Sequence, residues 1–560
     1  MLLLGNSKGR LNPETRFMRL FACGLVLICM IFVGKGLFAF ADEGGDAPPV
    51  NKGKITEVSD GLPTVTIGKE GEDSQKIRVP ANVPVEINGC PATLSELLPG
   101  DDCTVSKDAT GAVTKVAANR VTAGMVVDAS ASGVVLSADL VKKETYPLAP
   151  NATILVDGKK VDIAAVQKGD DGSLLLDKQK NIIKIETTHF DLPAKFWNNF
   201  RSNLFKPLLL FFYVGFCIPL LRVAFEFPKP IYQGLTIYLL VSIGWHGGEE
   251  LAVLSNKAFQ QAFSFMSVGF LTNSAIAVIA YLMLRFFVPK LRKVDAATVA
   301  AYYGSDSAGT FVTCMGVLQA AHIASAPYMP VMLAIMEIPG CLVGLLLVMN
   351  LRNKGMDSLG NMPGEPNYKA RTPEEIAANP PKSHSWGHVL HEIFFNAGSF
   401  LLFGGIIIGY VSRLQGLKVV QADDALFISL FQGILCLFLL EMGMTAARRL
   451  QDLRSVNSTY IAFGLIAPNV FALFGLIVAQ LLSHVLHQPF QLGTYTLFAV
   501  LCAAASYIAV PAVQRLAIPE ASPSLPLAAS LGLTFSYNVT IGIPLYMLIA
   551  QVLMRSFPVS

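Results

Sequence analysis

The stretch Gly304-Ser305-Asp306-Ser307-Ala308-Gly309-Thr310 places small and polar residues inside a long apolar run. A second stretch, Ala503-Ala504-Ala505-Ser506-Tyr507-Ile508-Ala509-Val510-Pro511, does the same at a matching position of a later run. A helix that breaks inside a bilayer frees backbone N–H and C=O groups that lipid cannot satisfy, so such a break survives only where it lines a polar cavity. Paired breaks in corresponding positions of two halves are typical of the binding site of a secondary transporter.

The composition around these stretches is that of a membrane protein. Hydrophobic residues make up 52% of the chain and charged residues 15%, which lies outside the range of a soluble globular domain. The apolar residues are concentrated after Pro193, whereas the part from Asp42 to Pro193 has the composition of a soluble domain. The net charge of +3 gives no case for nucleic acid, because nucleic-acid binding requires a clustered basic face.

Catalytic and metal chemistry are not indicated. The chain contains no Cys-x-x-Cys pair. His384, His388 and His391 have the spacing of metal ligands on a helix, but they lack an acidic or cysteine partner set, so a solvated histidine cluster is favoured over a metal site. No nucleophile–base set is visible, and the sequence therefore predicts neither an enzyme nor a resident cofactor.

Residues 1–41 have the layout of an export signal. A basic N-terminal region precedes an apolar run from Leu20 to Val33, and Ala39-Phe40-Ala41 then offers an Ala-x-Ala cleavage site. We expect a cleaved signal peptide; an uncleaved membrane anchor is the alternative. Either interpretation places the next domain on the outer side of a bacterial cytoplasmic (inner) membrane.

Residues 42–193 are predicted to form an all-β extracytoplasmic domain that contains a duplicated module. Asn88-Gly89 and Gly100-Asp101-Asp102 of the first copy match Asp157-Gly158 and Gly169-Asp170-Asp171 of the second at a constant offset. Each copy alternates apolar and polar residues before the Asn-Gly or Asp-Gly turn, a pattern of short strands and hairpins. We expect two small β-barrel or β-roll modules that act in binding or as a spacer.

Two cysteines distinguish the copies. Cys90 and Cys103 occur only in the first, and Lys159 and Gly172 stand at the equivalent positions of the second. An oxidising outer compartment allows the two thiols to form a disulfide. We favour the disulfide slightly, and two free thiols are the alternative.

The rest of the chain predicts about ten membrane-spanning helices, because apolar runs long enough to cross a bilayer follow one another. A first transmembrane repeat over 194–350 and a second over 389–560 are joined by a cytoplasmic linker, 351–388, which is rich in Gly and Pro and is expected to be flexible. The predicted spans are 204–221, 231–248, 263–288, 296–320, 328–350, 391–411, 425–445, 457–484, 493–514 and 525–552.

The distribution of basic residues predicts the orientation of these spans. With the β domain outside, the inner loops carry most of the Lys and Arg residues, and Arg201 and Lys206 at the outer end of the first span are the exceptions. Five spans in each half invert the second half relative to the first. The predicted fold class is therefore a multi-span α-helical membrane protein of 5+5 inverted repeats, with broken crossover helices at the fourth and ninth spans.

Motifs along this half resemble the sodium-dependent bicarbonate transporter family. They are Gly247-Gly248, Tyr303 to Thr310, Met336-Glu337-Ile338-Pro339-Gly340, Met442-Gly443-Met444, Leu465-Ile466-Ala467-Pro468, Ala505 to Pro511, and Ile541-Gly542-Ile543-Pro544-Leu545. The signal peptide and the duplicated outer domain are not part of the usual family pattern. The best-known bicarbonate carriers also have a serine-rich second break with an aspartate, whereas this chain carries its acid, Asp306, in the first break.

The resemblance implies partners as well as a fold. It implies a homotrimer of ten-span subunits in membrane lipid, with a small inorganic anion held between the two breaks and Na⁺ close by as the coupling ion. Some family members are inhibited by a PII-like nucleotide-binding protein on the cytoplasmic face, and the resemblance extends that expectation to this chain.

We predict that the anion contacts residues of both breaks. These residues are Gly304, Ser305, Ser307, Ala308, Gly309 and Thr310 in the first break and Ala505, Ser506 and Tyr507 in the second. Their hydroxyls can donate to an anion or supply oxygen ligands to Na⁺. The alternative is that small polar residues only allow the helices to pack closely.

Three polar residues at membrane depth, Asp306, Glu337 and Asn538, are predicted to bind the cation. An ionisable group inside a membrane is costly and is by default a functional candidate. For Asp306 the alternative is a cap on the half-helix that follows. For Glu337 it is a hydrogen bond to backbone groups that Pro339 leaves free.

Together these features predict Na⁺-coupled uptake of bicarbonate or a related small anion by alternating access. The rival from another class is a membrane-anchored sensor whose outer domain binds the ligand; a transporter of a different small solute is a further alternative. A passive anchor has no need of interrupted helices, which favours the transporter.

Overall fold

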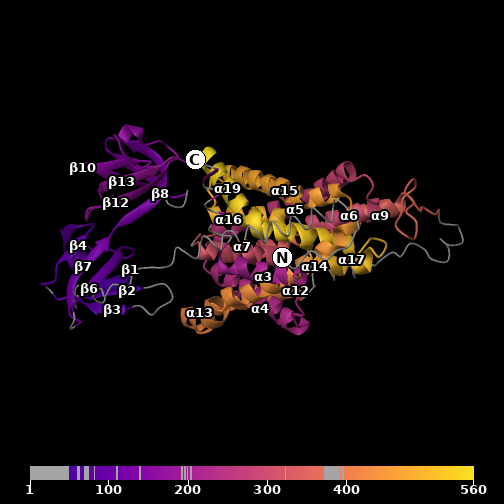
Figure 1. Ribbon diagram of the computed structural model, residues 1–560, viewed down its shortest axis with the longest axis horizontal. Helices are drawn as coiled ribbons and strands as arrows, with labels where there is room; N and C mark the ends of the chain where they lie inside the picture. Colours follow the sequence, from indigo (N-terminus) through magenta and orange to yellow (C-terminus); the bar gives the residue numbers. More distant parts are fainter. Residues whose placement is uncertain are drawn as a thin grey trace, which may run out of the picture. The chain divides into compact units, whose positions relative to one another are not determined.

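The computed structural model describes residues 50–59, 64–68, 75–80, 82–108, 111–137, 141–190, 193–194, 197, 200–201, 205–321, 323–370, 391 and 397–559. The chain divides into two compact units, Met1–Phe190 and Asp191–Ser560 (Figure 1). The predicted signal peptide over residues 1–41 lies outside the described residues, as do His384 and His388.

The first unit begins with a seven-stranded sheet. Its strands are β1 (Val50–Ser59), β2 (Thr64–Gly68), β3 (Gln75–Arg78), β4 (Val85–Ile87), β5 (Cys90–Ala92), β6 (Asp102–Lys107) and β7 (Val113–Asn119). They lie in the order β3-β2-β1-β6-β7-β4-β5. Successive side chains of a strand point to opposite faces, and the inward-facing set that includes Ile55, Val65, Ile87, Val105 and Val116 forms the core of this module.

The second β module has strands equivalent to those of the first. They are β8 (Val121–Ser130), β9 (Gly133–Ser137), β10 (Glu144–Val156), β11 (Lys159–Lys160), β12 (Asp171–Leu176) and β13 (Ile182–Thr188). They lie in the order β11-β10-β13-β12-β8-β9, and an additional pairing of β9 with β10 closes the sheet into a barrel. Because β12 and β13 each begin 69 residues after β6 and β7, equivalent residues of the two modules occupy equivalent positions.

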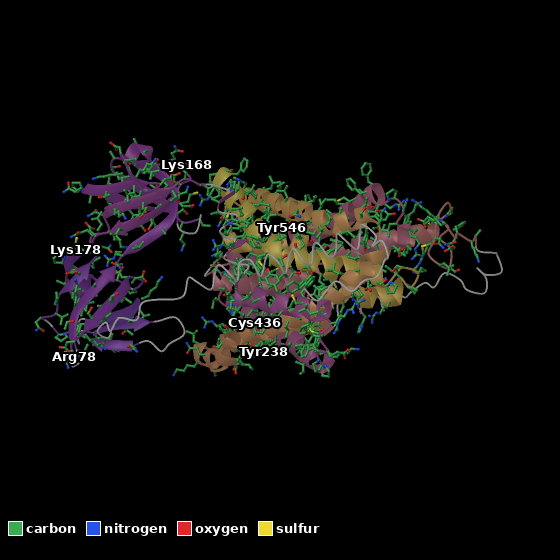
Figure 2. All side chains as sticks on the ribbon, viewed as in Figure 1. Arg78, Lys168, Lys178, Tyr238, Cys436 and Tyr546 are labelled. Atoms are coloured by element: carbon green, nitrogen blue, oxygen red, sulfur yellow. The ribbon has the colours of Figure 1, made fainter. Side chains whose placement is uncertain are left out.

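A polar contact joins the two modules within this unit. Asn88, in the turn between β4 and β5, donates through Nδ2 to the carbonyl oxygen of Leu176 at 2.5 Å. Arg120 donates through Nη1 to the carbonyl oxygen of Lys178 at 3.3 Å, and the Lys178 ammonium lies 3.3 Å from Glu96 Oε1 (Figure 2). The first module thus contacts the β12–β13 turn of the second.

The disulfide favoured from the sequence is wrong, because Cys90 and Cys103 are both free thiols. Cys103 faces the core of the first module and is 2% exposed, whereas Cys90 faces solvent. Burial and, to a smaller extent, the neighbouring Asp101 charge together raise the pKa of the Cys103 thiol to about 11. The alternation of side chains along the strands turns one thiol inward and leaves the other outside.

The second unit is helical. Its helices are α3 (Pro207–Leu220), α4 (Lys229–Leu251), α5 (Asn256–Phe287), α6 (Lys293–Tyr303), α7 (Ala308–Ala320), α8 (Met329–Met336), α9 (Ile338–Asn353), α12 (Ala397–Gln415), α13 (Leu417–Asp424), α14 (Phe431–Arg449), α15 (Ser458–Val485), α16 (Leu492–Ala503), α17 (Ala509–Ala517), α18 (Ser524–Leu527) and α19 (Ile543–Ser556), with π-helical segments η4 (Ala425–Ser429), η6 (Ala528–Phe535) and η7 (Asn538–Gly542). Among the described residues, 5 helices are long and apolar enough to cross a membrane: Phe259–Phe287, Met329–Asn353, Leu426–Arg449, Ser458–Val485 and Ser524–Ser556.

The two breaks expected from the sequence are present as interruptions between helices. The fourth predicted span is divided between α6 and α7, and the ninth is divided between α16 and α17. Each of these half-helices is too short to cross a bilayer alone. The remaining predicted spans coincide with one helix or with consecutive helical segments of this unit, and the last, 525–552, takes in α18, η6, η7 and α19.

Glycines bring helices α3 and α14 into backbone contact. A Cβ on Gly215 of α3 would collide with the carbonyl oxygen of Leu440, which lies three residues before Gly443 on α14. Conversely, a Cβ on Gly443 would collide with the carbonyl oxygen of Phe212, three residues before Gly215. Each glycine therefore makes room for the backbone of the other helix, as small residues do in packed membrane helices.

The same arrangement joins α4 and α12. A Cβ on Gly409 of α12 would collide with the carbonyl oxygen of Trp245, and one on Gly248 of α4 would collide with that of Ile406. Trp245 lies three residues before Gly248, and Ile406 lies three residues before Gly409. The pair α4–α12 thus repeats the contact of the pair α3–α14. In one pair the first predicted span of the first half packs on the second predicted span of the second half, and in the other pair the second predicted span of the first half packs on the first predicted span of the second half.

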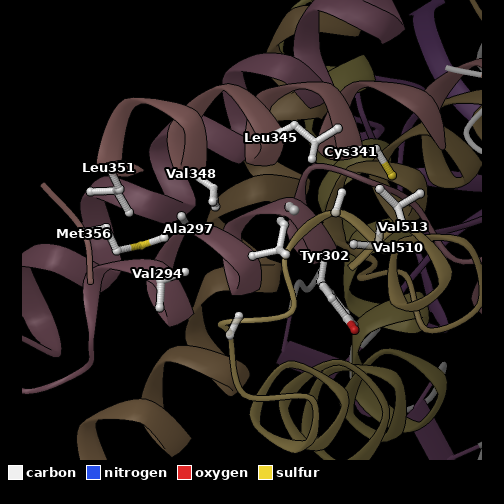
Figure 3. Close-up of a cluster of buried hydrophobic side chains, with 14 of the residues drawn as sticks. Val294, Ala297, Tyr302, Cys341, Leu345, Val348, Leu351, Met356, Val510 and Val513 are labelled. Carbon is white, nitrogen blue, oxygen red and sulfur yellow. The ribbon is translucent and has the colours of Figure 1, made fainter. Parts of the chain in front are cut away.

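The first part of the predicted linker is folded into a compact loop, which we term the 354–370 strap. Asp357 accepts hydrogen bonds from the backbone amides of Leu359, Asn361 and Lys369 at 2.9, 2.7 and 3.1 Å. Met356 and Met362 of the strap join the buried cluster formed by residues of α6, α9 and α17 (Figure 3). Residues 371–390, the remainder of the predicted linker, lie outside the described residues.

Candidate functional site

The first break separates the end of α6 from the capped start of α7. Gly304 follows α6, and a Cβ there would collide with Ala277 of α5, so the turn requires a glycine. Ser307 is the N-cap of α7, and its hydroxyl oxygen accepts from the Thr310 amide at 3.3 Å and from the Thr310 hydroxyl at 3.0 Å. The first-turn amides of α7 carry the positive end of the helix dipole, which suits an anion.

Ser305 and Glu337 lie side by side where the first break crosses the start of α9. The Ser305 hydroxyl donates to the carbonyl oxygen of Glu337 at 2.6 Å. A Cβ on Gly340 would collide with the carbonyl oxygen of Ala301, and it would lie 2.6 Å from the Ser305 nitrogen. The absence of a side chain at Gly340, near the start of α9, therefore lets the interrupted backbone approach closely.

Asp306 is the most isolated charge in the site. The residue is 1% exposed, and neither carboxylate oxygen accepts a hydrogen bond from any residue that the structure describes. Its nearest ionisable neighbours include Glu337 and Cys502, with which it interacts electrostatically. A buried carboxylate without a partner is strongly unfavourable, so the arrangement suits a cation or a proton at this position.

The second break crosses the first and is hydrogen-bonded to it. After α16 ends at Ala503, the amide of Ser506 donates to the carbonyl oxygens of Tyr302 and Ser305 at 2.8 and 3.1 Å. The Ser506 hydroxyl oxygen then accepts from the Val510 amide at the start of α17, at 3.5 Å. Ala505 is buried beside it. The structure thus brings the two predicted break segments together.

Tyr507 lies over the start of α7. A Cβ on Gly309 would collide with the Tyr507 hydroxyl, so the absence of a side chain at Gly309 is what admits the tyrosine. The ring of Tyr507 packs edge-on against Phe535, with centroids 5.7 Å apart. The Tyr507 hydroxyl of the second break therefore lies against the N-terminal turn of α7, which follows the first break.

Asn538 lies beside the second break but has other contacts. Its Nδ2 donates to the carbonyl oxygen of Ala503, the last residue of α16, at 3.0 Å. Its Oδ1 accepts from the Tyr546 hydroxyl at 2.8 Å. The side chain of Asn538 thus links the end of α16 to Tyr546 of α19, and its role as a cation ligand stays a prediction.

A small pocket opens beside the point where the breaks meet. Its lining comes from four elements: Thr236, Leu239 and Leu240 of α4, Ala308, Gly309 and Val312 of α7, Phe438 of α14 and Ile508 of the second break. The first turn of α7 contributes to the lining, and Thr236 is the lining residue that carries a hydroxyl. Ser305, Asp306 and Ser506 do not line the pocket.

Sequence reasoning missed the residues that α4 and α14 contribute. Thr236 is an isolated hydroxyl in an apolar helix and donates to the carbonyl oxygen of Tyr232 at 2.9 Å. Phe438 stacks on Tyr232 with centroids 5.9 Å apart. Asn273 of α5, which donates to the carbonyl oxygen of Met336 at 2.9 Å, was also missed. For Asn273, an amide inside an apolar helix was the available signal.

Comparison with known proteins identifies a match to one family model. A family model described as the Na⁺-dependent bicarbonate transporter superfamily matches residues 207–551. The match covers more than half of the chain and includes both breaks, the pocket lining and the paired glycines. It leaves out the β modules of the first unit. No curated protein matches the chain.

Proposed function

The chain belongs to the Na⁺-dependent bicarbonate transporter superfamily, and on that premise we propose that it takes up bicarbonate, or a closely related small anion, together with Na⁺. The observation that carries the proposal is the meeting of the two breaks at the pocket. There the first turn of α7 supplies backbone donors and a positive dipole end to a pocket between elements of both halves.

The anion is proposed to bind at Ala308 and Gly309, where the first turn of α7 lines the pocket. Bicarbonate has one O–H donor besides its acceptor oxygens, so a site for it needs an acceptor as well as amide donors. Thr236 also lines the pocket, and its hydroxyl hydrogen is already directed to Tyr232, which leaves its oxygen to accept. Tyr507 closes the side of the pocket near Gly309.

The cation is proposed to bind at Asp306. This buried carboxylate has no hydrogen-bond donor among the described residues, and the hydroxyl of Ser307 and the carbonyl groups of the broken backbone supply further oxygen ligands of the kind Na⁺ prefers. Na⁺ there would offset the charge of Asp306 and strengthen anion binding at the start of α7. The coupling of the two solutes thus follows from electrostatics.

We further propose ten spans arranged as two inverted halves that alternate access to the pocket. The exchanged glycine contacts of α3–α14 and α4–α12 support an internal two-fold relation between the halves. Helices α4 and α14 line the pocket together with the interrupted helices, so relative motion of these two groups would open it to either side. The homotrimer, the PII-like partner and the extracytoplasmic position of the β modules are further proposals that rest on the family pattern and on the distribution of basic residues.

The test is uptake of labelled bicarbonate into proteoliposomes, with an inward Na⁺ gradient and with K⁺ in its place. We expect accumulation above equilibrium only with the Na⁺ gradient. Asp306→Asn should abolish the dependence on Na⁺, because the neutral amide no longer attracts the cation. Glu250→Gln is the matched control, since this carboxylate on α4 is 42% exposed and lies outside the pocket.

The outcomes separate the parts of the proposal. Folded wild-type protein without Na⁺-driven accumulation would refute bicarbonate symport and favour another solute or a sensor. Unchanged Na⁺ dependence in Asp306→Asn would refute the cation site alone.

A further inference from the structure

Three clustered positions of the first β module recur 69 residues later in the second, with altered chemistry. The equivalent residues are Asn88 and Asp157, Asp101 and Asp170, and Arg120 and His189. The carboxylate is kept in both modules. An amide is replaced by an acid, and a permanent cation is replaced by a titratable imidazole.

In the first module the cluster carries a permanent ion pair. Arg120 donates through Nε and Nη2 to the two carboxylate oxygens of Asp101, at 2.9 and 2.7 Å. Both side chains are at most 6% exposed, and the amide of Arg120 donates to Asn88 Oδ1 at 3.1 Å. A guanidinium stays protonated at any physiological pH. The ion pair of Arg120 with Asp101 therefore fixes the C-terminal end of β7 at any such pH.

In the second module the imidazole of His189 lies between two carboxylates. His189 Nδ1 is 2.9 Å from Asp170 Oδ1, and Nε2 is 3.8 Å from Asp157 Oδ2. The backbone amide of His189 also donates to Asp157 Oδ1 at 3.3 Å. The charged groups facing the ring thus come from the loop before β12 and from the β10–β11 turn. The side chain is 46% exposed, so protons reach it from solvent.

The protonation state of the ring changes these contacts. A protonated imidazole donates from both nitrogens, one toward each carboxylate. A neutral imidazole keeps one N–H, so whichever nitrogen loses its proton directs a lone pair at a carboxylate. The hydrogen bond to Asp170 and then its charge raise the pKa of His189; burial opposes them to a smaller extent, and the charge of Asp157 adds the smallest increase.

We infer that His189 is a proton-binding site that closes the end of the second β module. Protonation holds the last residues of β13 against Asp170 and Asp157, and loss of the proton leaves two carboxylates unbalanced and loosens the chain where it leaves the module. Phe190 is the last residue of this unit, so the site controls the point at which the β domain continues toward the helical unit. A group with a raised folded-state pKa stabilises below its ordinary pKa and loses that effect as the pH rises through the raised value.

The test is hydrogen–deuterium exchange of the full-length protein in lipid nanodiscs between about pH 5.5 and 8.5, corrected for the intrinsic exchange rate. We expect the protection of residues 182–190 to fall about two- to fivefold with rising pH, the range that exposed ion pairs provide. Residues 113–120 are the internal control, because the equivalent strand, β7, is followed by Arg120 in place of the histidine and should keep constant protection. His189→Arg copies the first module and should remove the pH dependence.

Asp157→Asn provides a second variant at an exposed position. It copies Asn88 and should weaken the pH dependence, because one of the two facing carboxylates is lost. The inference is overturned if the segments 182–190 and 113–120 respond to pH alike in the wild type. It is equally overturned if the pH dependence of 182–190 persists in either variant at its wild-type size.

Discussion

Gly309 shows how one missing side chain shapes the site. The residue stands in the first turn of α7, it lines the pocket, and the space where its Cβ would lie is taken by the hydroxyl of Tyr507. A methyl group there would push the second break away from the first and would cover the amides that we assign to the anion.

Gly309→Ala is therefore expected to reduce Na⁺-driven uptake by about tenfold or more, since forcing a methyl into a packed site costs about 1–3 kcal/mol. Gly404→Ala is the matched control, because a Cβ on this glycine of α12 meets no atom within 4 Å. Both variants should reach the membrane in equal amounts. Equal uptake by the two variants would contradict the assignment of Gly309 to the site.

Single residues of the breaks could be predicted from the sequence, and pocket residues from other helices could not. Ser307 and Gly309 stand out because a helix cannot continue through Gly304 to Thr310 without unsatisfied backbone. Thr236 gives no such signal, since a threonine in an apolar helix commonly bonds to its own backbone. Only the packing of α4 against α7 brings that hydroxyl to the pocket.

At the scale of elements, the 354–370 strap depends on one carboxylate. Burial by itself raises the pKa of Asp357, but the hydrogen bonds it accepts from Asn361, Lys369 and Leu359 outweigh burial and hold the pKa below its ordinary value. A lowered pKa means that this stabilisation is complete above the ordinary pKa of an aspartate, about 4. It is lost only as the pH falls through the lowered value.

Asp357→Ala should loosen the strap, because it leaves several amide donors without an acceptor and costs about 1–3 kcal/mol. The measurement is hydrogen exchange over residues 354–370 at neutral pH, where protection should fall. Asp452→Ala is the control, since this carboxylate is 38% exposed and pairs with Arg449 on the surface. Unaltered protection in Asp357→Ala would show that the strap is held by Met356 and Met362 instead.

The sequence predicted the elements better than their connections. The breaks and the β strands follow from local signals, namely small polar residues in an apolar run and alternation before a turn. The strap was expected to be flexible because Gly and Pro are frequent in it. Its order comes from Asp357 and from methionines packed on α6, α9 and α17, which composition does not reveal.

At the scale of the whole molecule, backbone contacts across glycines hold helices of the two halves together. Gly443→Ala should lower the midpoint of thermal unfolding in detergent by several degrees, because its Cβ would collide with the backbone of Phe212. Gly433→Ala on the same helix is the control. A Cβ there meets no atom within 4 Å, and the gain in helix propensity predicts an unchanged or higher midpoint. A lower midpoint in Gly433→Ala alone would contradict the contact.

The division into an N-terminal β region and a C-terminal helical region was evident from composition, because apolar residues are concentrated after Pro193. Which helices pair was not. Nothing in the sequence around Gly215 and Gly443 marks them as contact partners. Their contact is evident only from the packing of α3 against α14.

The exchanged pairing also bears on how the chain is made. Helix α3 packs against α14 and helix α4 packs against α12, so neither half can bury its own glycine faces. In the proposed ten-span topology, α3 and α4 would therefore remain in the bilayer with their glycine faces exposed to lipid until residues 397–449 have been synthesised. If the two halves were expressed as separate chains, they would have to associate by diffusion in the membrane. The fraction that assembles would then measure how specifically α3 and α4 bind α14 and α12.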